Sequence, residues 1–136
     1  MDSAYTGPLP EPTQDSQPYW DGLKRHKLLF QRCVSCGTIR HYPRPMCATC
    51  HSMELEWIES RGHGHVHSWA VTHHAFHPSV KDRLPYVMAM VDMEEGVRVN
   101  APLRGCAPED VSVGLGVSIA FEDVTPDVTF PAFTLA

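Results

Sequence analysis

The chain has 136 residues, of which 43% are hydrophobic and 20% are charged. This profile is typical of one domain or two small packed modules, and it excludes a large multidomain enzyme and a disordered chain. No run of about 18 apolar residues is present and the N-terminus is acidic and proline-rich, so we expect a cytoplasmic protein without a membrane span or signal peptide. The formal net charge of −5 disfavours partners recognised through a phosphate backbone, because such binding usually draws on a basic face.

The N-terminal region divides into an arm and a helix. Residues 1–14 are rich in proline and lack apolar periodicity, so we interpret them as a flexible or extended arm. A short helix is predicted over residues 17–26, because Ser16 offers an N-cap and Tyr19 and Trp20 begin a helical apolar pattern. We expect this aromatic pair to pack on the rest of the chain, with docking on a partner as the alternative.

Four of the five cysteines form two Cys-x-x-Cys pairs, Cys33 with Cys36 and Cys47 with Cys50. In a chain without a secretion signal, such pairs indicate metal binding before disulfides. Each pair places two thiolates on one ion, and two pairs complete the tetrahedral sulfur shell that zinc prefers, although iron is accepted by the same shell. A redox-active pair is instead expected alone at a helix N-terminus. The protein would fill all four positions, so we predict a structural zinc ion that leaves no site for water or substrate.

From residue 55 onward, every segment has the pattern of a strand bounded by turn residues. The predicted strands cover residues 55–60, 64–76, 85–93, 97–104 and 115–122. Five strands at this spacing suggest a small closed β-barrel. One helical turn is expected at residues 107–111, between the last two strands.

The remaining candidate residues have ordinary interpretations beside the chemical ones. His63, His65 and His67 alternate along a predicted strand, so they share one face and offer a second metal site, but plain surface histidines are the simpler interpretation. His73 ends that strand beside a loop, where a ligand or partner is commonly contacted. Cys106, the fifth cysteine, is expected to be a small buried hydrophobe and not a reactive thiol.

A set of motifs spread over nearly the whole chain carries a family resemblance. The motifs are Tyr19-Trp20-Asp21-Gly22-Leu23, the four cysteines with Pro43-Arg44-Pro45, Gly62-His63-Gly64 with Val66 and Ser68, Pro85-Tyr86-Val87, Glu95-Gly96-Val97, Gly114-Leu115-Gly116-Val117 and Phe130-Pro131-Ala132-Phe133. On these motifs the chain resembles the DUF35 family. The resemblance implies a mainly β fold with an N-terminal helix, a rubredoxin-like zinc ribbon and a C-terminal five-stranded OB-fold barrel. We place the arm at residues 1–14, the helix and zinc ribbon at 15–52, and the OB-fold at 53–136.

The same resemblance implies a function. Proteins of this kind are small accessory subunits in hetero-oligomers that process acyl-CoA, where a thiolase, a thiolase-like aldolase or a MaoC-type hydratase carries the catalysis. We therefore expect no catalysis by this chain alone. Its implied role is to stabilise that partner and help to hold the CoA ester, in the degradation of steroids, fatty acids (lipid degradation) or aromatic compounds. His73, Phe76 and Tyr86 are the expected contacts to CoA or to the partner.

Two other hypotheses remain open at this point. Zinc ribbons and OB-folds also bind single-stranded nucleic acid, and Trp69, Phe76 and Tyr86 would then be stacking residues. Salt-dependent binding to oligonucleotides separates this hypothesis from the first. The other alternative is an independent hydrolase that uses the histidines, but no serine-elbow or phosphate-loop motif supports it.

Overall fold

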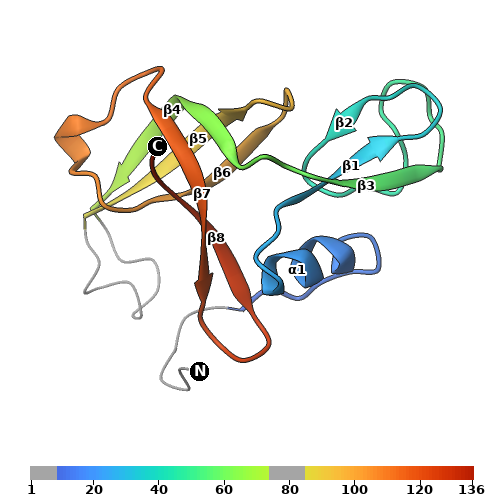
Figure 1. Cartoon of the computed structure of the whole chain (residues 1–136), viewed down its shortest axis with the longest axis horizontal. Helices are drawn as coiled ribbons and strands as arrows, with labels where there is room; N and C mark the ends of the chain where they lie inside the picture. The colour runs from blue at the N-terminus through green and yellow to red at the C-terminus, as the bar shows by residue number, and fades with distance from the viewer. Residues whose placement is uncertain (1–8, 74–84) are drawn as a thin grey trace.

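A computed structural model describes residues 9–73 and 85–136 of the chain (Figure 1). It is mainly β, with a short helix, a three-stranded sheet and a closed five-stranded barrel, which confirms the predicted fold class. Residues 1–8 of the predicted arm and Phe76, a predicted contact residue, lie outside the described residues. In the described part of the chain, no helix has the length and apolar character needed to cross a bilayer.

Helix α1 (Gln17–Lys24) starts where the sequence predicts and ends two residues early. The buried Ser16 hydroxyl does not cap the helix, and instead accepts a hydrogen bond of 2.9 Å from the backbone N–H of Thr13. The helix stops because His26 has a φ of 58°, in the left-handed region. Gly22 allows α1 to lie close to the following strand, since a Cβ at this position would stand 2.7 Å from Leu29 Cδ1.

The three-stranded sheet belongs to the cysteine module. It has the order β2-β1-β3, with β1 (Leu29–Cys33), β2 (Ile39–Arg40) and β3 (Leu55–Glu59) all antiparallel to their neighbours. The prediction that residues 55–60 form a barrel strand was therefore wrong. Side chains that alternate between two faces indicate that a segment is a strand, but they do not identify the strand with which it pairs. Here the second cysteine pair turns the chain back, so that Leu55 lies opposite Cys33.

The barrel has the strand order β4-β5-β6-β8-β7. Its strands are β4 (His63–Thr72), β5 (Tyr86–Met93), β6 (Arg98–Leu103), β7 (Gly116–Asp123) and β8 (Thr129–Leu135). The sequence did not predict β8, because its central Pro131 argues against a strand. In the structure β8 pairs along its length with β7, whereas its pairing with β6 is recorded only between Leu103 and Phe133, where it closes the barrel. The short 3-10 helix Pro108–Asp110 corresponds to the helical turn expected before β7.

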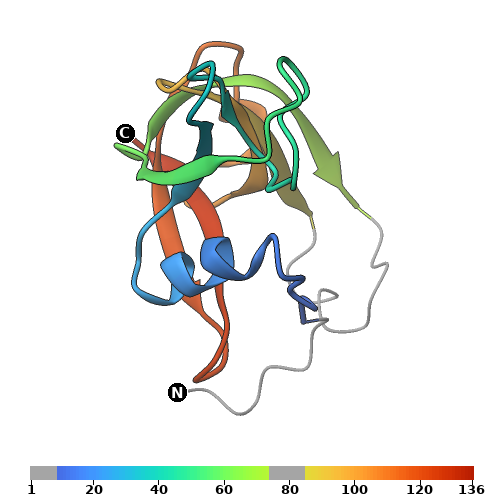
Figure 2. The ribbon, with the colours of Figure 1, turned by 90° about the vertical axis from the view of Figure 1, so that its right-hand side faces the viewer.

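A continuous apolar core joins the three parts of the fold. Tyr19 and Leu23 of α1 and Phe30 of β1 belong to the same buried cluster as Val66 and Phe133 of the barrel. Helix α1 therefore packs against the rest of the chain, as the sequence predicts. Figure 2 views the molecule from the side of the ribbon, with the ribbon in front of the barrel and α1 below it.

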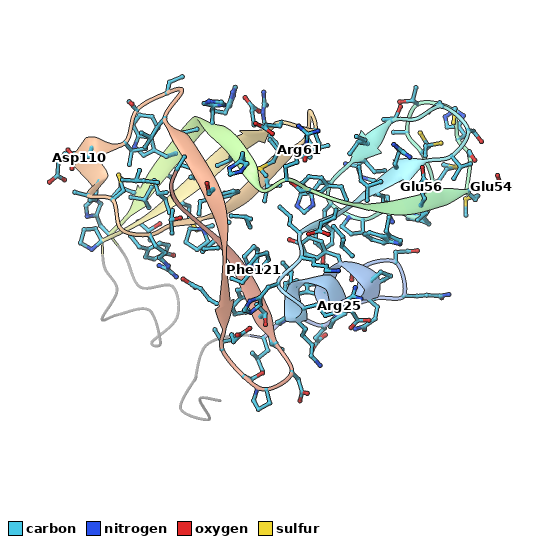
Figure 3. All side chains as sticks on the ribbon, in the orientation of Figure 1. Arg25, Glu54, Glu56, Arg61, Asp110 and Phe121 are labelled. Carbon is cyan, nitrogen blue, oxygen red and sulfur yellow. The ribbon has the colours of Figure 1, made fainter. Side chains whose placement is uncertain are left out.

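Two polar links fix the ribbon and helix on the barrel. Glu95, at the β5–β6 turn, accepts hydrogen bonds from Ser60 Oγ at 3.0 Å and from the backbone N–H of Arg61 at 2.8 Å, which holds the connection between β3 and β4. Figure 3 shows Phe121 of β7 near the end of α1. Its ring stacks on His26 with a centroid separation of 5.1 Å, and His26 Nε2 lies 3.0 Å from both carboxylate oxygens of Asp123.

Candidate metal centre and ligand pocket

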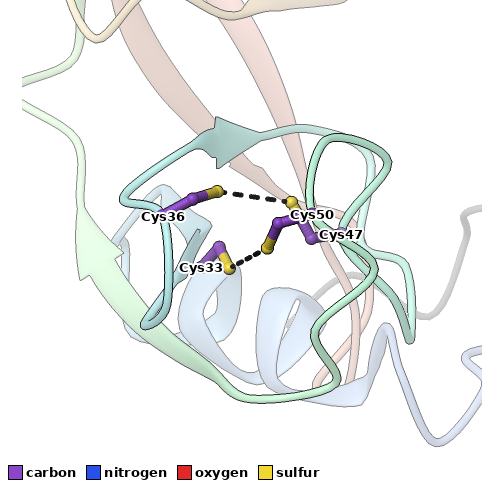
Figure 4. A group of neighbouring side chains, drawn as sticks. All are labelled: Cys33, Cys36, Cys47 and Cys50. Carbon is purple, nitrogen blue, oxygen red and sulfur yellow. Dashed lines mark hydrogen bonds between the residues drawn. The ribbon is translucent and has the colours of Figure 1, made fainter.

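The four cysteines converge at the end of the ribbon sheet (Figure 4). Cys33 Sγ lies 3.5 Å from Cys50 Sγ, Cys36 Sγ lies 3.7 Å from Cys47 Sγ, and all four sulfurs are within 4.8 Å of one another. A disulfide would need about 2.05 Å, whereas a tetrahedral ion with bonds of about 2.3 Å separates its sulfurs by about 3.8 Å. The four side chains are thus positioned to bind one metal ion, and the sulfur set suits zinc.

The same turn is used twice to present these sulfurs. In the first knuckle the N–H of Gly37 donates to the carbonyl of Cys33, and in the second the N–H of His51 donates to the carbonyl of Cys47, both at 2.9 Å. The donor residue has a positive φ in each case, 79° at Gly37 and 64° at His51. The left-handed backbone favours glycine, so the second knuckle carries a conformational cost that the first avoids.

The electrostatics of the cysteine cluster call for a cation. The backbone N–H groups of Cys50 and Thr49 lower the pKa of the Cys47 thiol to about 6. The N–H of Ser52 lowers the pKa of the Cys50 thiol. The surrounding thiols, Cys33 foremost, and burial have the larger combined effect and raise this pKa to about 12. Because like charges this close disfavour one another, the four sulfurs become thiolates together only around a positive ion.

A buried polar network holds the loop between the two knuckles against β1. Gln31, which is 1% exposed, accepts hydrogen bonds at its Oε1 from Arg40 Nε at 2.6 Å and from the backbone N–H of Arg44 at 2.9 Å. Arg40 Nη2 also donates to the carbonyl of Arg44 at 3.0 Å. Sequence reasoning missed this role of Gln31, because a glutamine in a short strand has the pattern of a surface residue.

A pocket of about 370 Å³ lies where α1, the ribbon loop and the barrel meet. Five aromatic side chains, drawn from all three parts, line it: Tyr19, Trp20, Tyr42, Tyr86 and Phe130. Two contacts fix these walls. Trp20 Nε1 donates to the Tyr42 hydroxyl at 2.9 Å, and the Trp20 and Phe130 rings meet edge to face at 6.1 Å.

Among the described residues, the charged side chains that line this pocket form one ion pair. Arg104 binds Glu122 through two hydrogen bonds, Nε to Oε2 at 2.9 Å and Nη2 to Oε1 at 3.2 Å. The two side chains, 30% and 31% exposed, neutralise one another at the pocket wall.

His41 also lines this pocket. Its ring packs against Tyr19 and Phe30, at centroid distances of 5.3 and 5.6 Å. Its Nδ1 atom is buried and has no hydrogen-bond partner within the described ranges. Burial lowers the pKa of His41 to about 4, so the imidazole is neutral at neutral pH. No local pattern in the sequence distinguishes His41, Arg104 or Glu122, because these residues meet only through long-range packing.

The residues predicted to contact CoA or the partner do not all lie together. Tyr86 is half-buried and lines the pocket. His73 is exposed just beyond the end of β4 and does not line it. Cys106 is half-buried against the core, and its Sγ donates to the carbonyl of Ala107 at 3.5 Å.

The three alternating histidines are all exposed on β4. His63 Nδ1 lies 3.1 Å from Ser118 Oγ, and His67 Nδ1 lies 3.2 Å from an Asp92 carboxylate oxygen. Among residues 9–73 and 85–136, these histidines do not form a group that could hold a metal. The pairing of β4 with β5 shifts its register between Val66 and Ser68.

Comparison with known proteins gives two matching family models. The model described as the rubredoxin-like zinc ribbon domain of ChsH2 matches residues 20–56. The model described as the C-terminal OB-fold domain of ChsH2 matches residues 57–122. The two matches follow one another without a gap and together cover most of the helix, the ribbon and most of the barrel.

The chain is also similar to individual proteins. It is 39% identical, over 84% of its length, to the 3-oxo-4,17-pregnadiene-20-carboxyl-CoA hydratase alpha subunit of Mycobacterium tuberculosis. It spans less than two-fifths of the length of each of the two curated hydratase alpha subunits it matches. A DUF35 domain-containing scaffold protein of Methanocaldococcus jannaschii is 34% identical, over 79% of this chain and 77% of that protein. A solved chain described as Ltp2-ChsH2(DUF35) aldolase superposes with a TM-score of 0.86 at 35% identity, covering 93% of this chain and 98% of that one.

Proposed function

Because the chain belongs to the DUF35 family, we propose that it is a non-catalytic accessory subunit of a complex that processes an acyl-CoA. The partner would be a thiolase-superfamily enzyme, such as a thiolase-like aldolase, with a hydratase as the second candidate. The observation that carries this proposal is the similarity to a chain of an aldolase complex over 98% of that chain's length. The acyl group of the hydratase relative, a 3-oxo steroid carboxylate, makes steroid breakdown the first pathway class to examine.

The metal in the ribbon is, in this proposal, one zinc ion held by the four cysteines. Bound there, it would cross-link the two knuckles and set the position of the loop that carries His41 and Tyr42. The sulfur spacing and the need for a neutralising cation support this role. Metal analysis of the purified chain is expected to give about one zinc per molecule, and a folded chain with no metal would contradict the assignment.

The subunit would also help to hold the CoA ester. The pocket beside Tyr86 supports this part of the proposal, because its walls are apolar and carry a few fixed polar groups, as small-molecule sites usually do. The pocket opens where α1 and the ribbon loop meet the barrel, so a partner that binds those elements would also border it.

Co-expression with a thiolase-like aldolase tests the proposal. We expect the two chains to co-elute in size-exclusion chromatography and the partner to gain thermal stability and activity. The control is Cys36→Ser with Cys47→Ser, which removes two ligands from different knuckles and is expected to abolish co-elution. Separate elution from both the aldolase and a MaoC-type hydratase, with unchanged activity of each, would show that the chain is not their subunit.

A further inference from the structure

Resting on the proposed function, we propose that the aromatic pocket receives the acyl half of the thioester and excludes its nucleotide half. The preferred acyl group is flat, uncharged and ring-containing, and it carries an oxygen that accepts a hydrogen bond from the Tyr42 hydroxyl.

The shape and lining of the pocket favour a flat apolar body. Its volume of about 370 Å³ falls within the roughly 300 to 1,000 Å³ of small-molecule sites. Trp20 and Phe130 form one wall through an edge-to-face contact, and Tyr86 and Met88 of β5 line the barrel side. Rings held in this way offer planar faces at little entropic cost, so a rigid ring system gains more contact than a flexible chain.

The charges of the pocket argue against the nucleotide half. Arg104 is the cation that lines it among the described residues, and it is already paired with Glu122 through two hydrogen bonds. Several phosphate charges placed here would lose water without gaining a free cation. The Glu122 carboxylate would also repel them. An uncharged acyl group meets neither penalty.

One polar group on the pocket wall indicates an oxygen on the ligand. The Tyr42 hydroxyl accepts a hydrogen bond of 2.9 Å from Trp20 Nε1, so its own proton remains for an acceptor. A carbonyl or hydroxyl oxygen of the ligand would accept this proton. The hydroxyl also separates a ligand site from a purely apolar docking groove.

Equilibrium dialysis of the zinc-loaded full chain, alone and in complex with its partner, tests this inference. The probe is radiolabelled 4-androstene-3,17-dione, a flat uncharged ring ketone. We expect saturable binding with one site per chain. An excess of free coenzyme A should not displace the probe, whereas an excess of unlabelled ring ketone should.

Three variants locate the binding. Tyr86→Ala is expected to weaken it at least tenfold, and Tyr42→Phe, which keeps the ring but removes the hydroxyl, about threefold to tenfold. Leu135→Ala, at an exposed position outside the pocket, should leave it unchanged. Displacement by coenzyme A, no saturable binding in either state, or full binding by Tyr86→Ala would each overturn the inference. Loss of binding when the partner is added would show that a side chain of the partner fills the pocket instead.

Co-elution of Tyr86→Ala with the catalytic partner separates the two proposals. If the complex forms but no probe binds to the unsubstituted protein, only the ligand assignment fails. If no complex forms with any partner, the accessory-subunit proposal fails, whatever the dialysis shows.

Discussion

The ribbon and the barrel are stabilised in different ways, although they share one apolar cluster. The ribbon buries Phe30 in the shared cluster but leaves other apolar side chains exposed. Val34 and Met53 are 56% and 65% exposed, while Cys33 and Cys47 are buried. The barrel instead buries inward-facing side chains from all its strands, with Phe133 fully enclosed. We therefore expect the ribbon to depend on a bound ion, because it lacks a sufficient core of its own, whereas the closed sheet depends on burial.

The two modes of stabilisation meet at the pocket. His41 and Tyr42 come from the ribbon loop, and Tyr86 and Phe130 come from the barrel. Damage to either region should therefore alter the pocket, but through different causes. The following four experiments separate those causes, beginning with the largest effect.

Metal removal is expected to have the largest effect and to act on the ribbon first. Structural zinc contributes on the order of 10 kcal/mol in isolated zinc modules, so a chelator or Cys47→Ser should unfold the ribbon sheet. Hydrogen exchange should show loss of protection in β1 and β3, with the β5 and β7 amides still protected. Cys106→Ser, which removes the cysteine outside the cluster, is the control and should keep the metal. Unchanged protection of β1 after chelation would show that burial alone holds the ribbon.

Truncating the barrel core should give the next largest effect and spare the metal. Phe133→Ala removes a fully buried ring and is expected to lower the free energy of unfolding by about 3 to 5 kcal/mol. Leu135→Ala, two residues away and 48% exposed, should change it by less than about 0.5 kcal/mol. Urea unfolding measures both, with zinc content determined in parallel. Zinc loss from folded Phe133→Ala would contradict the division between the two regions.

Acidification is expected to weaken the contact between the regions through His41. The folded-state pKa of about 4 lies below the ordinary value of 6.5, because burial disfavours the imidazolium. As the pH falls, the unfolded chain therefore protonates His41 at a higher pH than the folded chain does. This contribution to stability is complete above pH 6.5 and is lost as the pH falls toward 4.

Between pH 6.5 and 5 the expected loss is about 1.5 kcal/mol. It is measured by urea unfolding at each pH. His41→Phe should remove this part of the pH dependence, whereas His65→Phe, at an exposed position, should retain it. Equal slopes for these two variants would rule out His41 as the source. The range stops at pH 5 because zinc release at lower pH has its own proton dependence.

The smallest expected effect is a change in the free energy of unfolding when the positive-φ residue of either cysteine knuckle is substituted. His51→Gly should raise the free energy of unfolding by about 1 kcal/mol, because φ is positive there and glycine adopts it without strain. Gly37→Ala should lower it by about the same amount. An added Cβ at Gly37 would meet no described atom within 4 Å, so backbone conformation alone is tested. Thermal unfolding of the zinc-loaded protein gives both values, and changes of the same sign would disprove the equivalence of the turns.

The ribbon's cysteine cluster could be predicted from the sequence more fully than the strand pairing of the barrel, because the cluster depends on residues close together in the chain. The cysteine cluster follows from local spacing, because a Cys-x-x-Cys turn fixes two sulfurs within four residues. The strand pattern was also recognised correctly in most of the barrel. The assignment of residues 55–60 to the barrel was wrong, and β8 was missed, because pairing depends on distant segments and Pro131 obscured the strand.

The sequence by itself determined that the chain is mainly β, that α1 starts after Ser16, and that four cysteines are positioned to bind a metal ion. These features depend on side-chain periodicity and on short spacings, which act within a few residues. Only the tertiary structure decided which sheet takes β3, how β8 closes the barrel, and that His41 meets Arg104 and Glu122 around one pocket. Those arrangements depend on contacts between segments far apart in the chain, for which a single sequence carries no local signal.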